Sequence, residues 1–240
     1  MKDQGMNVRK YLITGCIVFL IMPLVTCSKG PNLREVTTKA HIATSEARSY
    51  RMKGTTTYTS EGETHEIVSE GEFAAPDRFR AKISIETGQW CEVIKIGDKS
   101  YVRTSDELES GGGKSDATCV VLPIAEVLEP LDSLIDLEQL PDEGIDGVDC
   151  LHYRGKVDMD SLLEKTGMGY QQTPEFLEVM RRTSIDAELW VGKDDYLIRQ
   201  MITRIRFPES EPGTGAEKWV TQTTIFRFYD FNKPIAIEPP

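Results

Sequence analysis

The stretch that decides the fold is Ile185–Phe231, IDAELWVGKDDYLIRQMITRIRFPESEPGTGAEKWVTQTTIFRFYDF. It predicts three strands, at Ala187–Val191, Tyr196–Phe207 and Lys218–Tyr229, and the last two are long and rich in β-branched and aromatic residues. Gly192–Asp195 is typical of a hairpin loop, because Gly and Asp tolerate turn dihedrals. Strands this long and this apolar need something to cover, which is either a solid core or a cavity.

The strand pattern extends toward the N-terminus. In Arg78–Glu86 every second residue is apolar and the residues between are mostly charged or polar, as in a half-buried antiparallel strand. Gly97-Asp98 separates two apolar runs and predicts a hairpin. The expected earlier strands are Ser49–Thr59, Thr64–Phe73, Arg78–Glu86, Trp90–Ile96, Lys99–Thr104 and Asp149–Lys156.

Three regions have the spacing of helices. Apolar and small residues recur every three or four positions in Leu33–Ala47. Pro123–Leu140 has the same spacing and predicts two short helices separated at Pro130. Met159–Thr183 predicts a helix, a loop and a second helix. The sequence therefore predicts an α+β fold in which helices pack against one face of one large curved antiparallel sheet.

The charge of the chain argues against nucleic acid as a partner. The 240 residues carry a net charge of −11. Without residues 1–26, which hold three basic residues and one acidic residue, 25 basic and 38 acidic residues remain, a net charge of −13. Such a surface repels the phosphate backbone and gives little electrostatic attraction to an anionic membrane.

The N-terminus has the pattern of an export signal. Three basic residues precede the apolar run Tyr11–Thr26, whose 16 residues are fewer than the about 20 that span a bilayer. Leu24-Val25-Thr26-Cys27 is similar to a lipoprotein cleavage site, with Thr26 as a departure from the usual small residue. We expect acylation at Cys27, and an ordinary secretory signal or an uncleaved anchor are the alternatives.

This signal sets the expected domain organisation and redox environment. Residues 1–26 are the signal peptide, 27–32 a polar tether and 33–240 a single domain. Three cysteines remain in an exported body: Cys91, Cys119 and Cys150. One disulfide is possible in an oxidising compartment, and Cys91–Cys119 is the preferred pair.

No motif in the sequence calls for catalysis, a metal or a cofactor. The three histidines are far apart, and no HExxH, GxSxG or P-loop pattern is present. His152 lies among strand residues and is interpreted as a hydrogen-bonded histidine of the sheet. The acidic pair Asp194-Asp195 is explained by turn chemistry. We therefore expect a protein that is not an enzyme and has no cofactor or catalytic residues.

Short motifs, in their order along the chain, resemble the LppX/LprG-like lipoproteins, which are related in fold to the LolA/LolB lipoprotein carriers. The resemblance covers nearly all of the chain after the signal. The motifs are Ser49-Tyr50-Arg51, Pro76-Asp77-Arg78, Ile96-Gly97-Asp98 with Tyr101, His152-Tyr153, Leu189-Trp190-Val191-Gly192, Leu197-Ile198-Arg199-Gln200 and Tyr229-Asp230-Phe231-Asn232.

The resemblance implies a half-open β-barrel of about nine to eleven strands, with helices over its concave face and a hydrophobic cavity for acyl chains. By analogy, apolar residues of alternating strand positions line this cavity and the inserted helices form a lid. The cavity residues would be Phe79, Ile83, Ile85, Val93, Leu189, Val191, Met201, Ile205, Phe226 and Phe228. The lid residues would be Leu162, Leu163, Phe176 and Met180.

The resulting expectation is a monomeric, membrane-anchored envelope protein that binds or carries a lipid or acylated ligand, with an envelope transporter as a possible partner. A sensor or protein-interaction module built on the same sheet is the alternative. A hydrolase would need polar residues that converge inside the cavity, and the faces named above do not supply them.

Overall fold

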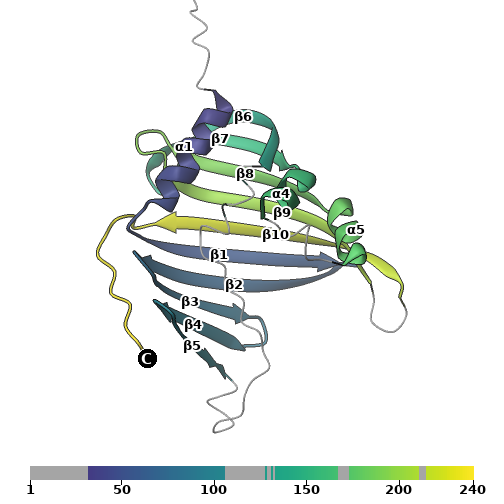
Figure 1. Cartoon of the computed structure of the whole chain (residues 1–240), viewed down its shortest axis with the longest axis horizontal. Coiled ribbons are helices and arrows are strands. Elements are labelled where there is room, and N and C mark those ends of the chain that lie inside the picture. The colour runs from purple at the N-terminus through teal and green to yellow at the C-terminus, as the bar shows by residue number, and fades with distance from the viewer. Residues whose placement is uncertain (1–31, 106–127, 129–130, 132, 167–172, 211–214) are drawn as a thin grey trace, which may run out of the picture. The chain divides into compact units, whose positions relative to one another are not determined.

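A computed structural model of the chain describes residues 32–105, 128, 131, 133–166, 173–210 and 215–240. Residues Pro31–Pro240 form one compact unit. In this unit ten antiparallel strands make a single curved sheet that is not closed, and the described helices lie over one of its faces (Figure 1). The predicted fold class is therefore confirmed.

The elements agree closely with the sequence pattern, with one exception given below. The strands are β1 (Ser49–Ser60), β2 (Glu63–Ala74), β3 (Arg78–Ile85), β4 (Trp90–Ile96), β5 (Lys99–Thr104), β6 (Leu134–Ile145), β7 (Val148–Val157), β8 (Ser184–Gly192), β9 (Ile198–Ser210) and β10 (Glu217–Tyr229). The helices are α1 (Leu33–Ser45), α4 (Met159–Thr166) and α5 (Pro174–Arg182).

The order of strands in the sheet is β5-β4-β3-β2-β1-β10-β9-β8-β7-β6. Two runs of sequential neighbours, β1 to β5 and β6 to β10, are thus joined where the first strand pairs with the last. This central pairing runs from Arg51 opposite Tyr229 to Ser60 opposite Val220. The short strand β5 and the acidic, bulged strand β6 form the two edges of the sheet. Short length, charge and bulges all disfavour pairing of an edge strand with another chain.

Helix α1 is fixed at both ends. The side-chain oxygen of Asn32 accepts a hydrogen bond from Arg34 N (3.2 Å) and caps the first turn. Near the other end, Ile198 N donates to Thr44 Oγ1 (3.0 Å), which attaches the helix to the start of β9. Val36 and Ala40 are buried between these points. The helix therefore packs its narrow apolar stripe on the sheet.

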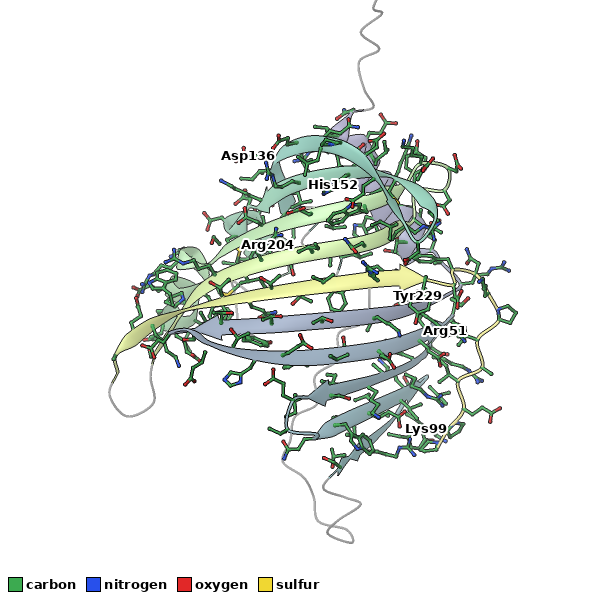
Figure 2. All side chains as sticks on the ribbon, turned by 180° about the vertical axis from the view of Figure 1, so that it is seen from behind. Arg51, Lys99, Asp136, His152, Arg204 and Tyr229 are labelled. Carbon is green, nitrogen blue, oxygen red and sulfur yellow. The ribbon has the colours of Figure 1, made fainter. Side chains whose placement is uncertain are left out.

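The two faces of the sheet differ sharply in chemistry. Toward the helices, the strands present an apolar cluster in which Tyr50, Leu189 and Met201 are almost fully buried. On the opposite face, charged side chains are paired across strands, as in the bonds from Arg51 to Glu72 (2.8 Å) and to Asp230 (2.7 Å). We call these the helix face and the outer face. Figure 2 shows the outer face with its charged residues.

One predicted helix is wrong. The sequence pattern placed helical structure up to Leu140, but residues from Leu134 onward form the edge strand β6. Its backbone pairs with β7, from Leu134 opposite Val157 to Ile145 opposite Val148. An edge strand buries few of its side chains, so its apolar residues need not alternate, and the spacing is then ambiguous. Residues 123–127, 129, 130 and 132 lie outside the described residues.

The last residues hold the ends of several strands together. Asn232 N donates to Ser49 O (2.8 Å), and Asn232 Oδ1 accepts from Arg48 N (2.8 Å). Further along, Arg78 Nη1 donates to Ile237 O (2.9 Å), and Ile237 is fully buried. The C-terminal segment therefore connects the start of β1 to the start of β3.

The cysteines fall into two classes. Cys91 on β4 is disulfide-bonded. Cys150 on β7 is a free thiol with no exposed surface, and burial raises the pKa of this thiol. Cys119, the preferred partner of Cys91 in the sequence analysis, lies outside the described residues.

The helix-face core makes a direct prediction for stability. Leu189 is 1% exposed inside the core cluster. Truncation to alanine leaves a cavity, so we expect Leu189→Ala to lower the free energy of unfolding by about 2–5 kcal/mol in urea titrations. Val102→Ala, at a residue that is 49% exposed, is the control and should cost no more than about 0.5 kcal/mol. Equal losses in the two variants would contradict this placement of the core.

Candidate functional site

The register of the sheet places all ten predicted cavity residues on the helix face. Phe228 is opposite Met52, which is opposite Gly71, then Ala81 and then Val93. Because residues opposite each other in neighbouring strands share a face, this row fixes one side of five strands. The remaining predicted residues belong to the same face by the same register, namely Phe79, Ile83, Ile85, Leu189, Val191, Met201, Ile205 and Phe226.

Burial divides the ten residues into two groups. Five are buried in the core and have no surface to offer a ligand, namely Phe79, Leu189, Val191, Met201 and Phe228. The other five are only half-buried, and Ile67 of β2 joins them on the same face. We call this second group the apolar patch, and it consists of Ile67, Ile83, Ile85, Val93, Ile205 and Phe226. The cavity role of these residues stays a prediction.

Sequence reasoning missed Ile67, although a signal for it was present. In β2, the exposed residues Glu66, Val68 and Glu70 lie on one face and Ile67 lies on the other. Its partners across the ladders are Thr56 and Ile85. Dividing β2 into its two faces would have found it.

A glycine allows the aromatic ring of the apolar patch to lie flat. Gly54 of β1 is opposite Phe226 of β10. A Cβ atom at Gly54 would be 2.7 Å from the Phe226 ring and 2.3 Å from Ser69 Oγ, far closer than real contacts. Met52 lies over Gly71 in the same manner, with a Cβ there 2.8 Å from its Cε. The floor of the helix face is therefore filled by side chains from neighbouring strands.

The helix face also holds polar groups that the sequence did not single out. Thr56 Oγ1 and Thr224 Oγ1 are 3.1 Å apart, and Gln222 Nε2 donates to Thr224 Oγ1 (3.2 Å). Thr203 is opposite Thr224 on β9. Threonine is common in strands for its branched Cβ, so its spacing alone gave no indication of a site.

The described helices lie over one half of the face. Figure 1 shows α1, α4 and α5 in front of β6 to β10, and none of the described helices lies over β3 to β5. The buried group of predicted residues lies mostly under these helices, and most of the apolar patch belongs to β2, β3 and β4. The patch is thus a continuation of the core beyond the described helices.

The predicted lid residues lie where the sequence placed them, in α4 and α5. Leu162 and Leu163 of α4 are buried, at 9% and 6% exposure. Phe176 and Met180 of α5 are half-buried, and no residue of α5 is fully buried. Met180 packs against the core cluster that contains Leu162. Helix α5 is therefore the more loosely packed of the two, and its role as a lid stays a prediction.

On the outer face, His152 belongs to a polar network. Its ring stacks on Trp190, with centroids 4.1 Å apart, and its Nε2 is 3.2 Å from Glu188 Oε2. Arg204 Nη1 donates to the other oxygen of Glu188 (2.6 Å). His152 and Arg204 are seen together in Figure 2. The interpretation of His152 as a hydrogen-bonded residue of the sheet is confirmed.

This network perturbs the carboxyl of Glu188. Burial by itself raises the pKa of Glu188, but the hydrogen bond and charge of Arg204, helped by His152, lower it below the ordinary value of 4.5. Glu188 therefore stays ionised and paired. Its two partners occupy both oxygens, which suits a structural role.

A half-open pocket of about 560 Å3 lies at the end of the sheet where β10 stops. It is lined by the β6–β7 turn, the β8–β9 turn and the segment Phe228–Lys233. Of the ten predicted cavity residues, only Phe228 contributes to it. The pocket is thus separate from the apolar patch.

Two further features bear on the kind of site. Among the described residues, no group of three or more His, Cys, Asp or Glu side chains is arranged to hold a metal ion. No helix in the described part of the chain is long and apolar enough to cross a membrane. Cys27 lies outside the described residues, and its acylation stays a prediction.

Comparison with known proteins finds similar folds but no family model that matches and no curated protein that matches. The Mycobacterium tuberculosis lipoprotein LppX is 11% identical, with 86% of this chain and 98% of LppX covered and a TM-score of 0.44. LprF from Mycobacterium bovis is 10% identical, with 87% and 96% covered and a TM-score of 0.41. MucB of Pseudomonas aeruginosa, in its complex with MucA, is 12% identical, with 85% and 56% covered and a TM-score of 0.39.

LppX, after which the group resembled by the sequence motifs is named, is among these structures. At these identities and TM-scores, the function of the chain has to be argued from its own residues.

The contact between Gly54 and Phe226 gives a second prediction. Gly54→Ala forces the Phe226 ring and Ser69 to move, so we expect a loss of about 1–3 kcal/mol in the free energy of unfolding. In the double variant Gly54→Ala/Phe226→Leu, the smaller leucine side chain should leave room for the new Cβ. The combined loss in the free energy of unfolding should therefore be less than the sum of the two single losses. Gly144→Ala is the control, because a Cβ there is 3.9 Å from its nearest neighbour. Additive losses would show that the ring does not cover Gly54.

The lowered pKa of Glu188 gives a third prediction. A carboxyl whose pKa falls on folding stabilises the protein above its unfolded pKa, and this contribution is lost as pH falls through the folded pKa. We therefore expect Glu188→Gln to be less stable than the parent at about pH 7 and the difference to shrink toward about pH 3. Urea titrations at several pH values measure this. A constant difference would mean that ionisation of Glu188 does not stabilise the fold.

Proposed function

We propose that the protein binds a lipid or an acylated molecule on its helix face, outside the cytoplasmic membrane. The observation that carries the proposal is the apolar patch, in which six half-buried apolar side chains from five strands extend the core. Four of these side chains, Ile67, Ile83, Ile85 and Val93, belong to the adjacent strands β2, β3 and β4, and apolar surface gathered in this way often marks a binding site. The export signal in the sequence supports a site in the cell envelope.

The energetics favour an acyl chain as the occupant. Each methylene that moves from water onto apolar surface contributes about 0.8 kcal/mol. A long chain can thus bind through contact area alone, without catalytic residues or ion pairs. The side chains that the patch offers, mainly isoleucines with Phe226 and Val93, supply such area and no charge.

The polar residues beside the patch suit the other end of such a ligand. Thr56 and Thr203 are both half-buried; Thr56 is directly opposite Ile67, and Thr203 is opposite Thr224, two residues from Phe226 in β10. Hydroxyls both donate and accept hydrogen bonds, so they can satisfy an ester or hydroxyl group of a lipid in an apolar setting. Helix α5, which has no fully buried residue, is the element that can move to admit the chain.

The wider role follows from the anchor predicted at Cys27. An acylated Cys27 would hold a monomeric domain at the outer surface of a membrane through the tether at residues 27–32. From there it would carry the lipid or present it to an envelope transporter. Native mass spectrometry distinguishes this from a module that binds only other proteins.

The test uses residues 28–240, purified without detergent and analysed by native mass spectrometry before and after organic extraction. We expect a co-purifying lipid in a stoichiometric amount. Ile83→Trp fills part of the apolar patch. It should reduce the fraction of protein that carries lipid at least about tenfold, because the larger side chain takes up apolar contact area that the lipid would use. Ile225→Trp is the matched control, because Ile225 is 37% exposed on the outer face.

Two outcomes would contradict the proposal. One is a protein that stays free of lipid when phospholipid and fatty acid are added. The other is an equal loss of lipid in Ile83→Trp and in Ile225→Trp, with both variants folded by circular dichroism. The first would favour a protein-binding role for the same sheet.

A further inference from the structure

The β6–β7 hairpin folds back over the outer face. Asp146 Oδ1 in the hairpin turn is 4.0 Å from Arg227 Nη1, and β8 and β9 lie between β7 and β10 in the sheet. The turn therefore reaches across two strands. This hairpin forms one wall of the half-open pocket of about 560 Å3, and the end of β10 with Tyr229 forms another. Figure 2 shows Tyr229 and Arg51 at this end of the sheet.

Four of the five charged residues that line the pocket are held in close ion pairs, and the fifth, Asp146, has a longer contact. Arg199 Nη2 pairs with Asp195. Asp230 accepts from Lys233 Nζ (2.6 Å) and from Arg51 Nη1 (2.7 Å). A ligand that pairs with Arg199, Lys233 or Asp230 would have to break these pairs, which leaves another charge unpaired. The pocket thus favours a neutral ligand.

Hydrogen-bonding capacity remains in spite of the pairing. A carboxylate has about four acceptor sites, so the paired aspartates retain acceptors. Asp146 is 65% exposed and has only the long contact with Arg227. The Nδ2 group of Asn232 and the hydroxyl of Tyr229 make no hydrogen bond to another described residue, and both residues line the pocket. Donors and acceptors are therefore interspersed around one space.

The rest of the wall is apolar. Leu197, Phe228 and Phe231 line the pocket, and the guanidinium of Arg199 lies 5.0 Å from the centre of the Phe231 ring. A volume of this size is within the range of about 300–1,000 Å3 of small-molecule sites. A neutral molecule with many hydroxyls and an apolar C–H face matches both kinds of wall.

We propose that this pocket binds a saccharide of one or two rings, separately from the lipid site. The sugar hydroxyls would donate to the carboxylate of Asp146 and to the remaining acceptor sites of Asp230, and they would accept from Asn232 and Tyr229. The C–H face of the ring would lie against the apolar wall. The site depends on the hairpin and the end of β10, and not on the apolar patch.

The test measures binding of soluble disaccharides, namely maltose, cellobiose, chitobiose and mannobiose, to residues 28–240 by saturation-transfer NMR and titration. We expect at least one to bind. Val148→Trp fills the pocket and should abolish the signal, whereas Val68→Trp, at a residue 40% exposed in the middle of the outer face, should not. Asp146→Asn keeps a residue that tolerates the φ of 50° and should weaken binding about tenfold, because a charge-assisted bond is lost.

Further arms separate this site from the lipid site. Octyl glucoside below its micelle concentration should compete with the bound sugar, and the parent and Ile83→Trp should bind the sugar equally. No binding by any disaccharide would overturn the proposal. So would binding that persists in folded Val148→Trp, or glycoside binding that is lost in Ile83→Trp alone. None of these results would change the lipid content found by mass spectrometry.

Discussion

The rest of the structure depends on the pairing of β1 with β10. These strands come from opposite ends of the described chain, and their ladder joins two hairpin runs into one sheet. Backbone N–H and C=O groups buried in the middle of a sheet need hydrogen-bond partners. Leaving the edge of β1 or of β10 unpaired would therefore cost much of the free energy of folding. The pairing also brings Phe226 over Gly54 and Phe228 beside Met52, which creates the floor of the helix face. The C-terminal segment then ties the start of β1 to β3.

The division into two chemically different faces follows from that sheet. On the outer face, charged side chains pair with one another, as Arg51 does with both Glu72 and Asp230. On the helix face, the described helices cover the half of the sheet made by β6 to β10, where Leu189 and Met201 are sealed. The apolar patch continues on the other half. The proposed ligand site on this face would need no dedicated cavity residues, since it would use the part of the core surface that the described helices do not cover.

Much of the fold could be predicted from single stretches. The strand Arg78–Ile85 can be predicted from its own residues, because burial of one face imposes an alternation of apolar and polar residues. The hairpin at Gly97-Asp98 can be predicted from its turn residues. The prediction was wrong at Leu134–Leu140, because an edge strand buries few side chains and its apolar spacing matched a helix equally well. For the candidate site, the shared face of the ten predicted residues was foreseen by alternation. Their division into buried and half-buried groups was not, because it depends on where the helices lie.

The sequence by itself determined the strand class, the two faces and the pattern of an export signal, since all three are properties of residues close together in the chain. Only the tertiary structure decided that the first and last strands meet, that Ile67 joins the apolar patch and that Phe79 and Val191 are sealed in the core. It alone brought the turn at Asp146 to the end of β10 and formed the charged pocket there. Contacts between residues so far apart depend on the register and curvature of the whole sheet, which no local pattern records.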